Sequence, residues 1–93
     1  MSEDGTARAA GRDRPREKLS RLGAPALGDN ELLALVLGYG SSGTSALGLA
    51  NLVLQASGGV HGLPGCTAEE LRRVPGFGQA RAAQVLASVE LGR

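Results

Sequence analysis

Apolar residues recur along this chain every three to four positions, which is the spacing of one face of an α-helix, and the runs end at glycine or proline. β-branched and aromatic residues are too few to build strands and never alternate with polar ones. We therefore expect an all-α fold, a small bundle of about five helices. These are predicted at 15–22, in GDNELLALVLG, at about 45–57, in TAEELRRV and at about 79–91.

Particular residues mark the ends and faces of these helices. Thr67 and Glu70 have the spacing of a capping box, in which each side chain accepts a hydrogen bond from the other residue's backbone N–H. The helix at 45–57 is apolar on most sides and is expected to be buried. The last helix has an apolar face and a polar one; Ala82, Val85, Leu86 and Val89 form the first, and Arg81, Gln84 and Ser88 the second.

The composition fits one small domain with a core of Leu, Val and Ala, because hydrophobic residues make up 42% of the 93 positions and aromatic residues 2%. Cys66 is the single cysteine, so neither a disulfide framework nor a cysteine zinc cluster is expected. No apolar run approaches the roughly 18 residues of a membrane span, and the N-terminus lacks the apolar core of a signal peptide. We expect a cytoplasmic protein without a membrane partner.

The net charge of +1 is unevenly distributed. Residues 1–21 hold six basic and four acidic side chains, and residues 69–93 hold four basic and three acidic ones. Residues 22–68 hold two acidic side chains and no basic one. An anion site is therefore expected near one of the ends. Residues 1–14 are charged and aperiodic and are predicted to be a disordered tail, which leaves 15–93 as the domain. The basic residues of this tail could hold DNA; they are Arg8, Arg12, Arg14 and Arg16. The carboxylates that alternate with them favour a solvated tail instead.

The stretch VPGFG, residues 74–78, joins two predicted helices and contains the only phenylalanine of the chain. Pro75 pushes the preceding residue out of the helical region and so ends the first helix. Gly76 and Gly78 can take positive φ and carry no side chain that would block an approaching group. Phe77 can point into the core and anchor the turn.

The next helix begins at once, so its first N–H groups are expected to face outward with the positive end of the helix dipole, a site that suits a phosphate. Arg81 adds a positive charge, and its replacement by alanine is expected to leave the fold intact. No side chain is placed to read bases. The candidate DNA-binding residues are Gly76, Phe77, Gly78, Gln79, Ala80 and Arg81; the alternative is a purely structural connector.

GYG at 38–40 recurs as GFG at 76–78, 38 positions later, with the only tyrosine and the only phenylalanine in the same slot. Two copies of a helix-hairpin-helix unit would explain the echo, although coincidence among 15 glycines is the alternative. The earlier of the two glycine-rich turns is a further possible hairpin site, which comprises Gly38, Tyr39, Gly40 and Gly43. Since no Lys or Arg occurs from 22 to 68, the hairpin at 76–78 is the preferred phosphate site.

LRRVPGFGQARAAQVL, residues 71–86, resembles the helix-hairpin-helix motif of DNA repair and recombination proteins. RPREKLSRLG, ALGDNELLALVLGYG, SALGLANLVL and ELGR resemble, in order, the N-terminal region of the RadC family (UPF0758) over nearly all of 14–93. The resemblance implies a double helix-hairpin-helix domain, similar to the second domain of RuvA, joined to a C-terminal JAB/MPN-type metallohydrolase-like domain. It also implies an association with DNA repair.

The zinc motif of a JAB domain, His-x-His followed by a distant Asp, is absent because His61 is the only histidine. We therefore expect a fragment or isolated domain that holds no metal or cofactor and is not an enzyme. Cys66 is expected to be an inert loop thiol. Arg72 and Arg73 are expected to lie on a solvated helix face. Serine side chains are expected in turns and at helix caps rather than as nucleophiles; these are Ser41, Ser42 and Ser45.

The sequence favours a non-catalytic module that binds the DNA backbone weakly and without sequence preference. The alternative is a scaffold that docks another protein or the missing JAB/MPN domain. A net charge of +1 favours the scaffold, since strong DNA binders are usually more basic.

Overall fold

The computed structural model describes residues 14–93, so the predicted tail lies outside the described residues except for Arg14. Within 14–93 there are helices only, with one isolated bridge between Ser41 and Thr44, and the expected all-α fold is confirmed. None of the helices in this part is long and apolar enough to cross a bilayer. The elements are α2 (Pro15–Leu22), η1 (Ala24–Ala26), α3 (Asp29–Leu37), α4 (Ala46–Ser57), η2 (Val60–Gly65), α5 (Ala68–Arg72) and α6 (Gln79–Leu91), where η marks a 3₁₀-helix.

The helices begin where capping residues predict. Ser45 accepts a hydrogen bond from the backbone N–H of Gly48 at 3.0 Å and so caps α4. The capping box before α5 is confirmed, because Thr67 Oγ1 lies 3.1 Å from the N–H of Glu70 and Glu70 Oε1 lies 2.8 Å from that of Thr67. These bonds satisfy amides that the first turns leave without helical partners.

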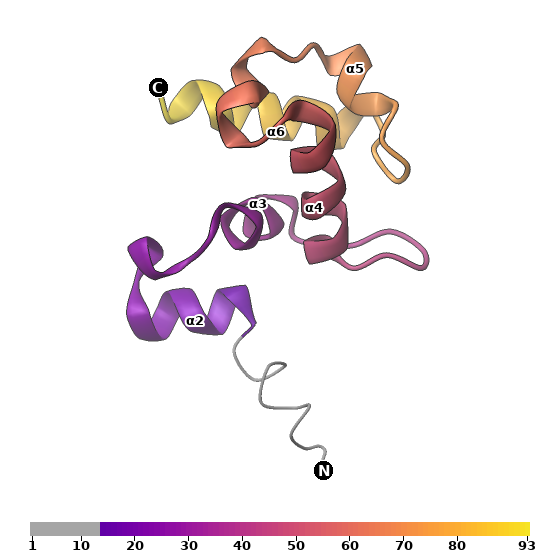
Figure 1. The fold of residues 1–93 in the computed structure, drawn as a ribbon. Coiled ribbons are helices and arrows are strands. Elements are labelled where there is room, and N and C mark those ends of the chain that lie inside the picture. Colours follow the sequence, from indigo (N-terminus) through magenta and orange to yellow (C-terminus); the bar gives the residue numbers. More distant parts are fainter. Residues whose placement is uncertain (1–13) are drawn as a thin grey trace.

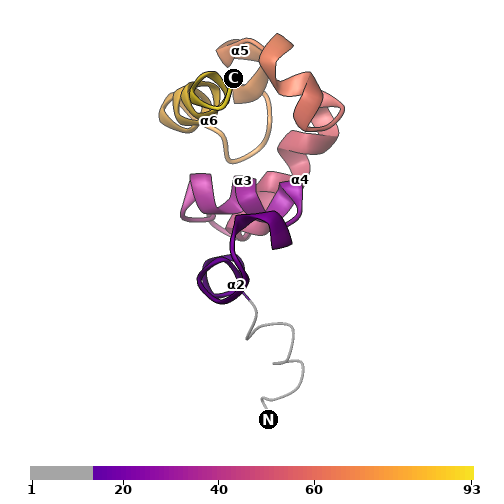
Figure 2. The ribbon, with the colours of Figure 1, turned by 90° about the vertical axis from the view of Figure 1, so that its left-hand side faces the viewer.

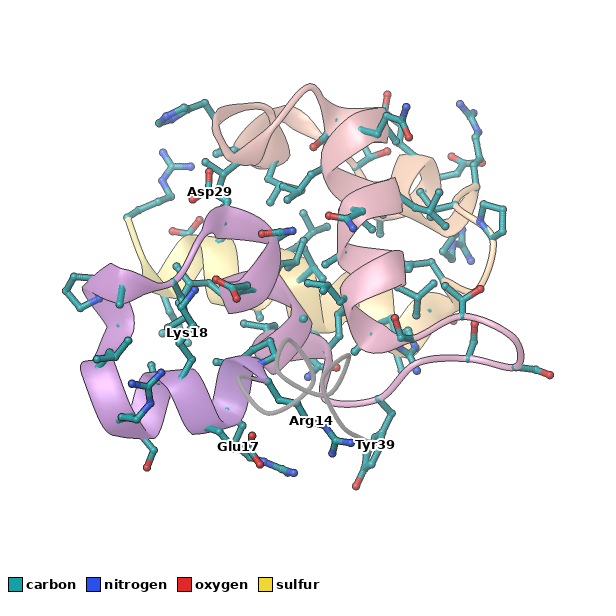
Figure 3. All side chains as sticks on the ribbon, turned by 60° about the horizontal axis from the view of Figure 1, so that its bottom comes forward. Arg14, Glu17, Lys18, Asp29 and Tyr39 are labelled. Carbon is teal, nitrogen blue, oxygen red and sulfur yellow. The ribbon has the colours of Figure 1, made fainter. Side chains whose placement is uncertain are left out.

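The helices form three tiers (Figures 1 and 2). α2 lies at one end, α3 and α4 are in the middle, and α5 and α6 cover the other end. An ion pair joins the first two tiers, with Lys18 Nζ 3.1 Å from Glu31 Oε1, and Figure 3 shows Lys18 pointing from α2 towards α3. Within the middle tier Asn30 Nδ2 donates to Asn51 Oδ1 at 3.1 Å.

The core forms where α4 meets the top tier. Its centre is fully buried and consists of Leu49, Ala50 and Val53 of α4 with Ala82 and Val85 of α6. Around them pack further aliphatic side chains and one aromatic: Leu33, Ala34, Leu37, Leu63, Leu71, Val74 and Phe77. This confirms the expected core of Leu, Val and Ala.

One prediction about burial is wrong. α4 is buried on one face only, because Leu47 and Leu52 are each 37% exposed. The buried face of this helix meets α3, η2 and the core residues of the top tier, whereas its outer face is left to solvent. α2 lies at the end of the molecule and packs mainly on α3 and η1, and none of its residues is buried.

Candidate nucleic-acid interface

The predicted hairpin between α5 and α6, residues 73–78 and called here the second hairpin, is anchored in the core. Phe77 is 5% exposed and Val74 is 6% exposed, so both side chains belong to the hydrophobic cluster. The N–H of Phe77 donates to the carbonyl of Val74 at 2.9 Å, which closes the turn around Pro75. The turn is therefore held from inside by Val74 and Phe77, while Pro75 and Gly78 are exposed.

Gly76 is required in this turn for two reasons. Its φ of +90° is a conformation that residues with a side chain rarely adopt. A Cβ here would lie 2.7 Å from Ser41 Oγ and 2.8 Å from Leu49 Cδ2. The backbone of Gly76 thus packs directly on α4 and on the loop that precedes it.

Gly78 differs from the expectation of positive φ. Its φ of −97° and ψ of −172° are extended, as is usual for the residue that caps a helix, and Gly78 stands at that position before α6. A Cβ at Gly78 would have no heavy atom within 4 Å. Gly78 is therefore open to solvent and to an approaching group, and any residue fits its backbone.

The N-terminus of α6 is left without a capping side chain among the described residues. The first hydrogen bond of this helix runs from Ala82 to the carbonyl of Gly78, so the N–H groups of Gln79, Ala80 and Arg81 precede the ladder. The side chains of Gln79 and Ala80 are exposed. These amides stand beside the open backbone at Gly78.

Arg81 occupies a place that the sequence did not predict. Its Nη1 donates to the carbonyl of Tyr39 at 2.6 Å and its Nη2 donates to the carbonyl of Gly40 at 2.9 Å. Gln84, one turn further on, donates from Nε2 to the carbonyl of Val36 in α3. The polar face of α6 therefore lies against the end of α3 and the loop after it. Arg81→Ala would remove two of these hydrogen bonds, and that the fold stays intact without them remains a prediction.

That loop, residues 38–45 and called here the first hairpin, repeats part of the second. Gly38 has a φ of +82°, close to the +90° of Gly76, so the first glycine of GYG and that of GFG both have a positive φ. Ser41 and Thr44 close the loop by two hydrogen bonds between their backbones, at 2.9 and 3.0 Å. Gly43, with a φ of +81°, lies between them at the tip.

The two aromatic residues in the shared slot differ in environment. Phe77 is buried whereas Tyr39 is 81% exposed, so the similarity of the two hairpins does not include the side chain between the glycines. Gly40 packs so closely on the next turn that a Cβ would lie 2.0 Å from the carbonyl oxygen of Thr44. The first hairpin is thus fixed by its backbone and by Arg81 rather than by an aromatic anchor.

The structure brings most candidate site residues to one side of the molecule. Figure 1 shows both hairpins projecting from the same side, on the right. They touch where Gly76 packs on Ser41 and where Arg81 binds the first hairpin. Ser41 and Gln84 are the contacts that sequence reasoning missed, because neither residue type marks such a role in advance.

The remaining candidates lie elsewhere or have ordinary roles. Arg72 is exposed just before the second hairpin, Arg73 is exposed at its first position, and His61 is exposed in η2. Cys66 is half-buried, with Sγ 3.5 Å from the carbonyl of Gly62. In the part of the chain that the structure describes, no three His, Cys, Asp or Glu side chains gather as a metal site would require.

Residues 7–83 match the family model described as UPF0758 N-terminal. Similar curated proteins are each named UPF0758 protein: one from Chloroflexus aurantiacus is 49% identical over 81 residues, one from Bordetella avium 50% over 80, and one from Geotalea uraniireducens 51% over 81. These alignments cover 85 to 87% of this chain but only 35 or 36% of the relatives, so the chain spans about a third of their length. No solved structure matches.

Proposed function

The chain belongs to the UPF0758 N-terminal family, and from this premise we propose that it is a non-catalytic, cytoplasmic DNA-binding module associated with DNA repair. It contacts the DNA backbone through the second hairpin without reading sequence. One observation carries the proposal: an uncapped helix N-terminus, that of α6, stands beside an open glycine at the end of a turn anchored in the core.

The chemistry of this hairpin suits a phosphate group. The first N–H groups of α6 point along the helix axis with the positive end of the helix dipole, and they can donate to phosphate oxygens. Gly78 leaves room for the phosphate, since no heavy atom lies within 4 Å of the place that its Cβ would take. Arg72 and Arg73 are exposed just before the turn and add positive charge.

Contact of this kind carries no information about sequence. After Arg73, the exposed part of the second hairpin presents backbone and proline, and the aromatic residue is turned into the core. Hydrogen bonds to phosphate oxygens fix the position of a protein on DNA, whereas base edges must be read by side chains in a groove. We therefore propose binding to DNA of any sequence.

The proposal is tested by titrating two labelled duplexes of unrelated sequence with the protein at several salt concentrations. Contact with two or three phosphates gives a slope of log K against log salt concentration of about −2 to −3, equal for both duplexes. Binding to one duplex only would contradict the proposed independence of sequence. The absence of binding to both duplexes and to a single strand at about 50 mM salt would rule out the function.

A scaffold is the second candidate, and a groove on the structure favours it. The groove has a volume of about 700 Å³, lies between α4, η2 and α5, and is lined by Leu52, Ala56, Cys66, Val74 and Pro75, with Glu70 and Arg73 among the polar residues. Such a surface could dock another protein or a JAB/MPN-type domain. Failure of the DNA titration together with binding of the isolated C-terminal part of a UPF0758 relative would establish this function instead.

A further inference from the structure

Tyr39 is an aromatic side chain that the fold leaves in solvent. It is the only tyrosine of the chain and is 81% exposed, while the only phenylalanine is buried. Figure 3 shows Tyr39 pointing away from the helices. Its ring does not serve the core, and an exposed ring of this size is available to a partner.

The backbone that carries this ring is fixed. The Tyr39 carbonyl accepts from Arg81 Nη1 at 2.6 Å, and the next carbonyl, that of Gly40, accepts from Nη2 at 2.9 Å. Gly40 is further confined by the carbonyl of Thr44, which leaves no space for a side chain at that position. Because the main chain is already ordered, binding through the ring costs little conformational entropy.

The same contact places the ring relative to the proposed phosphate site. Arg81 lies in the first turn of α6, whose N–H groups form that site, and its guanidinium reaches directly to Tyr39. The backbone that carries the ring is therefore held within the reach of one arginine side chain from the first turn of α6. This arrangement of a backbone contact and a stacking platform is typical of proteins that bind unpaired nucleic acid.

We propose that Tyr39 stacks on an unpaired base, so that the domain binds DNA containing unpaired nucleotides in preference to an intact duplex; this inference rests on the proposed DNA-binding function. Bases within a duplex are stacked on their neighbours and present no free face to the ring. An unpaired base does, and every base has such a face, so the preference is for DNA structure rather than for sequence.

The experiment compares three labelled DNAs of equal length by fluorescence anisotropy: an intact duplex, the same duplex with a central run of unpaired bases, and a single strand. The wild-type protein is expected to bind the interrupted duplex about fivefold to about a hundredfold more tightly than the intact duplex. Tyr39→Ala is expected to abolish that preference while leaving affinity for the intact duplex unchanged. Tyr39→Phe, which keeps the ring, is expected to retain it.

A second readout follows from the composition of the chain. There is one tyrosine and no tryptophan, so the intrinsic emission of the protein reports on Tyr39 alone. Stacking on a base is expected to quench this emission when the single strand is added. Unchanged emission at saturating single strand would overturn the inference.

The outcomes separate this inference from the function on which it rests. Equal affinity for intact and interrupted duplexes overturns the inference and leaves DNA binding in place. An equal loss of affinity for all three DNAs in Tyr39→Ala also overturns it, because the ring would then contact the backbone generally. No binding to any of the three DNAs refutes the proposed function, and the inference with it.

Discussion

Arg81 and Tyr39, 42 positions apart in the sequence, are joined by a hydrogen bond of 2.6 Å from the guanidinium of the first to the carbonyl oxygen of the second. With the neighbouring bond to Gly40, this contact ties the first turn of α6 to the first hairpin. Gly76 packs on Ser41 of the same loop. The two hairpins are thus one connected surface rather than two separate loops.

The first prediction concerns the stability that Arg81 supplies. Arg81→Ala removes two hydrogen bonds from a charged donor to backbone carbonyls and is expected to lower the free energy of unfolding by about 1–3 kcal/mol. Arg72→Ala is the matched control, since Arg72 is exposed, and it is expected to change stability by less than about 0.5 kcal/mol. Urea denaturation followed by circular dichroism measures both. Equal stability of the two variants would show that the Arg81 contacts contribute nothing to the fold.

The second prediction concerns the close approach of the hairpins at Gly76. Gly76→Ala forces a side chain into a positive φ and into contact with Ser41 and Leu49, and we expect a loss of at least about 2 kcal/mol. Gly65→Ala is the control, because a Cβ there meets open space. Adding Ser41→Ala to Gly76→Ala removes one of the clashing atoms and is expected to restore part of the loss. A double variant no more stable than Gly76→Ala would contradict the packing described.

The third prediction separates the two aromatic residues. Phe77→Ala leaves a cavity beneath the second hairpin and is expected to cost about 3–5 kcal/mol, enough to unfold much of a domain of this size. Tyr39→Ala removes a ring that is 81% exposed and is expected to cost less than about 0.5 kcal/mol. Thermal unfolding of the two variants compares them directly. Similar losses would mean that the two hairpins are equivalent after all.

The sequence predicted the helices well because the signals involved are local. Proline at the first position of α2, serine before α4 and the pair of Thr67 and Glu70 each act within a few residues, and the structure has each where expected. The burial of Phe77 followed from its being the one large aromatic in a turn that had to be anchored.

The site was predicted less completely because its decisive contacts join residues far apart in the chain. Nothing near Arg81 in sequence indicates that its partner is a carbonyl beyond the end of α3. The same limit applies to glycine: Gly76 and Gly78 are identical in type, yet only the first has a positive φ and a packed neighbour. From the sequence, Arg81 was expected to be replaceable without effect on the fold, whereas in the structure Gly78 is the residue with open space around it.

Gly78 allows a substitution that changes the proposed phosphate site and spares the fold. Its extended backbone accepts any residue, and a Cβ there meets open space. Asp and Asn are both good caps that accept hydrogen bonds from the first N–H groups of a helix, so both variants are expected to be as stable as the wild type or slightly more stable. They differ only in that Asp adds a negative charge where a phosphate is proposed to bind.

The most direct measurement of the central claim is the affinity of the Gly78→Asp and Gly78→Asn variants for one duplex at about 50 mM salt, with circular dichroism to show that both are folded. If the backbone of DNA binds at the N-terminus of α6, Gly78→Asp binds at least about tenfold more weakly than Gly78→Asn, because the carboxylate repels the phosphate. Equal affinity of the two folded variants would show that DNA does not bind at this helix end.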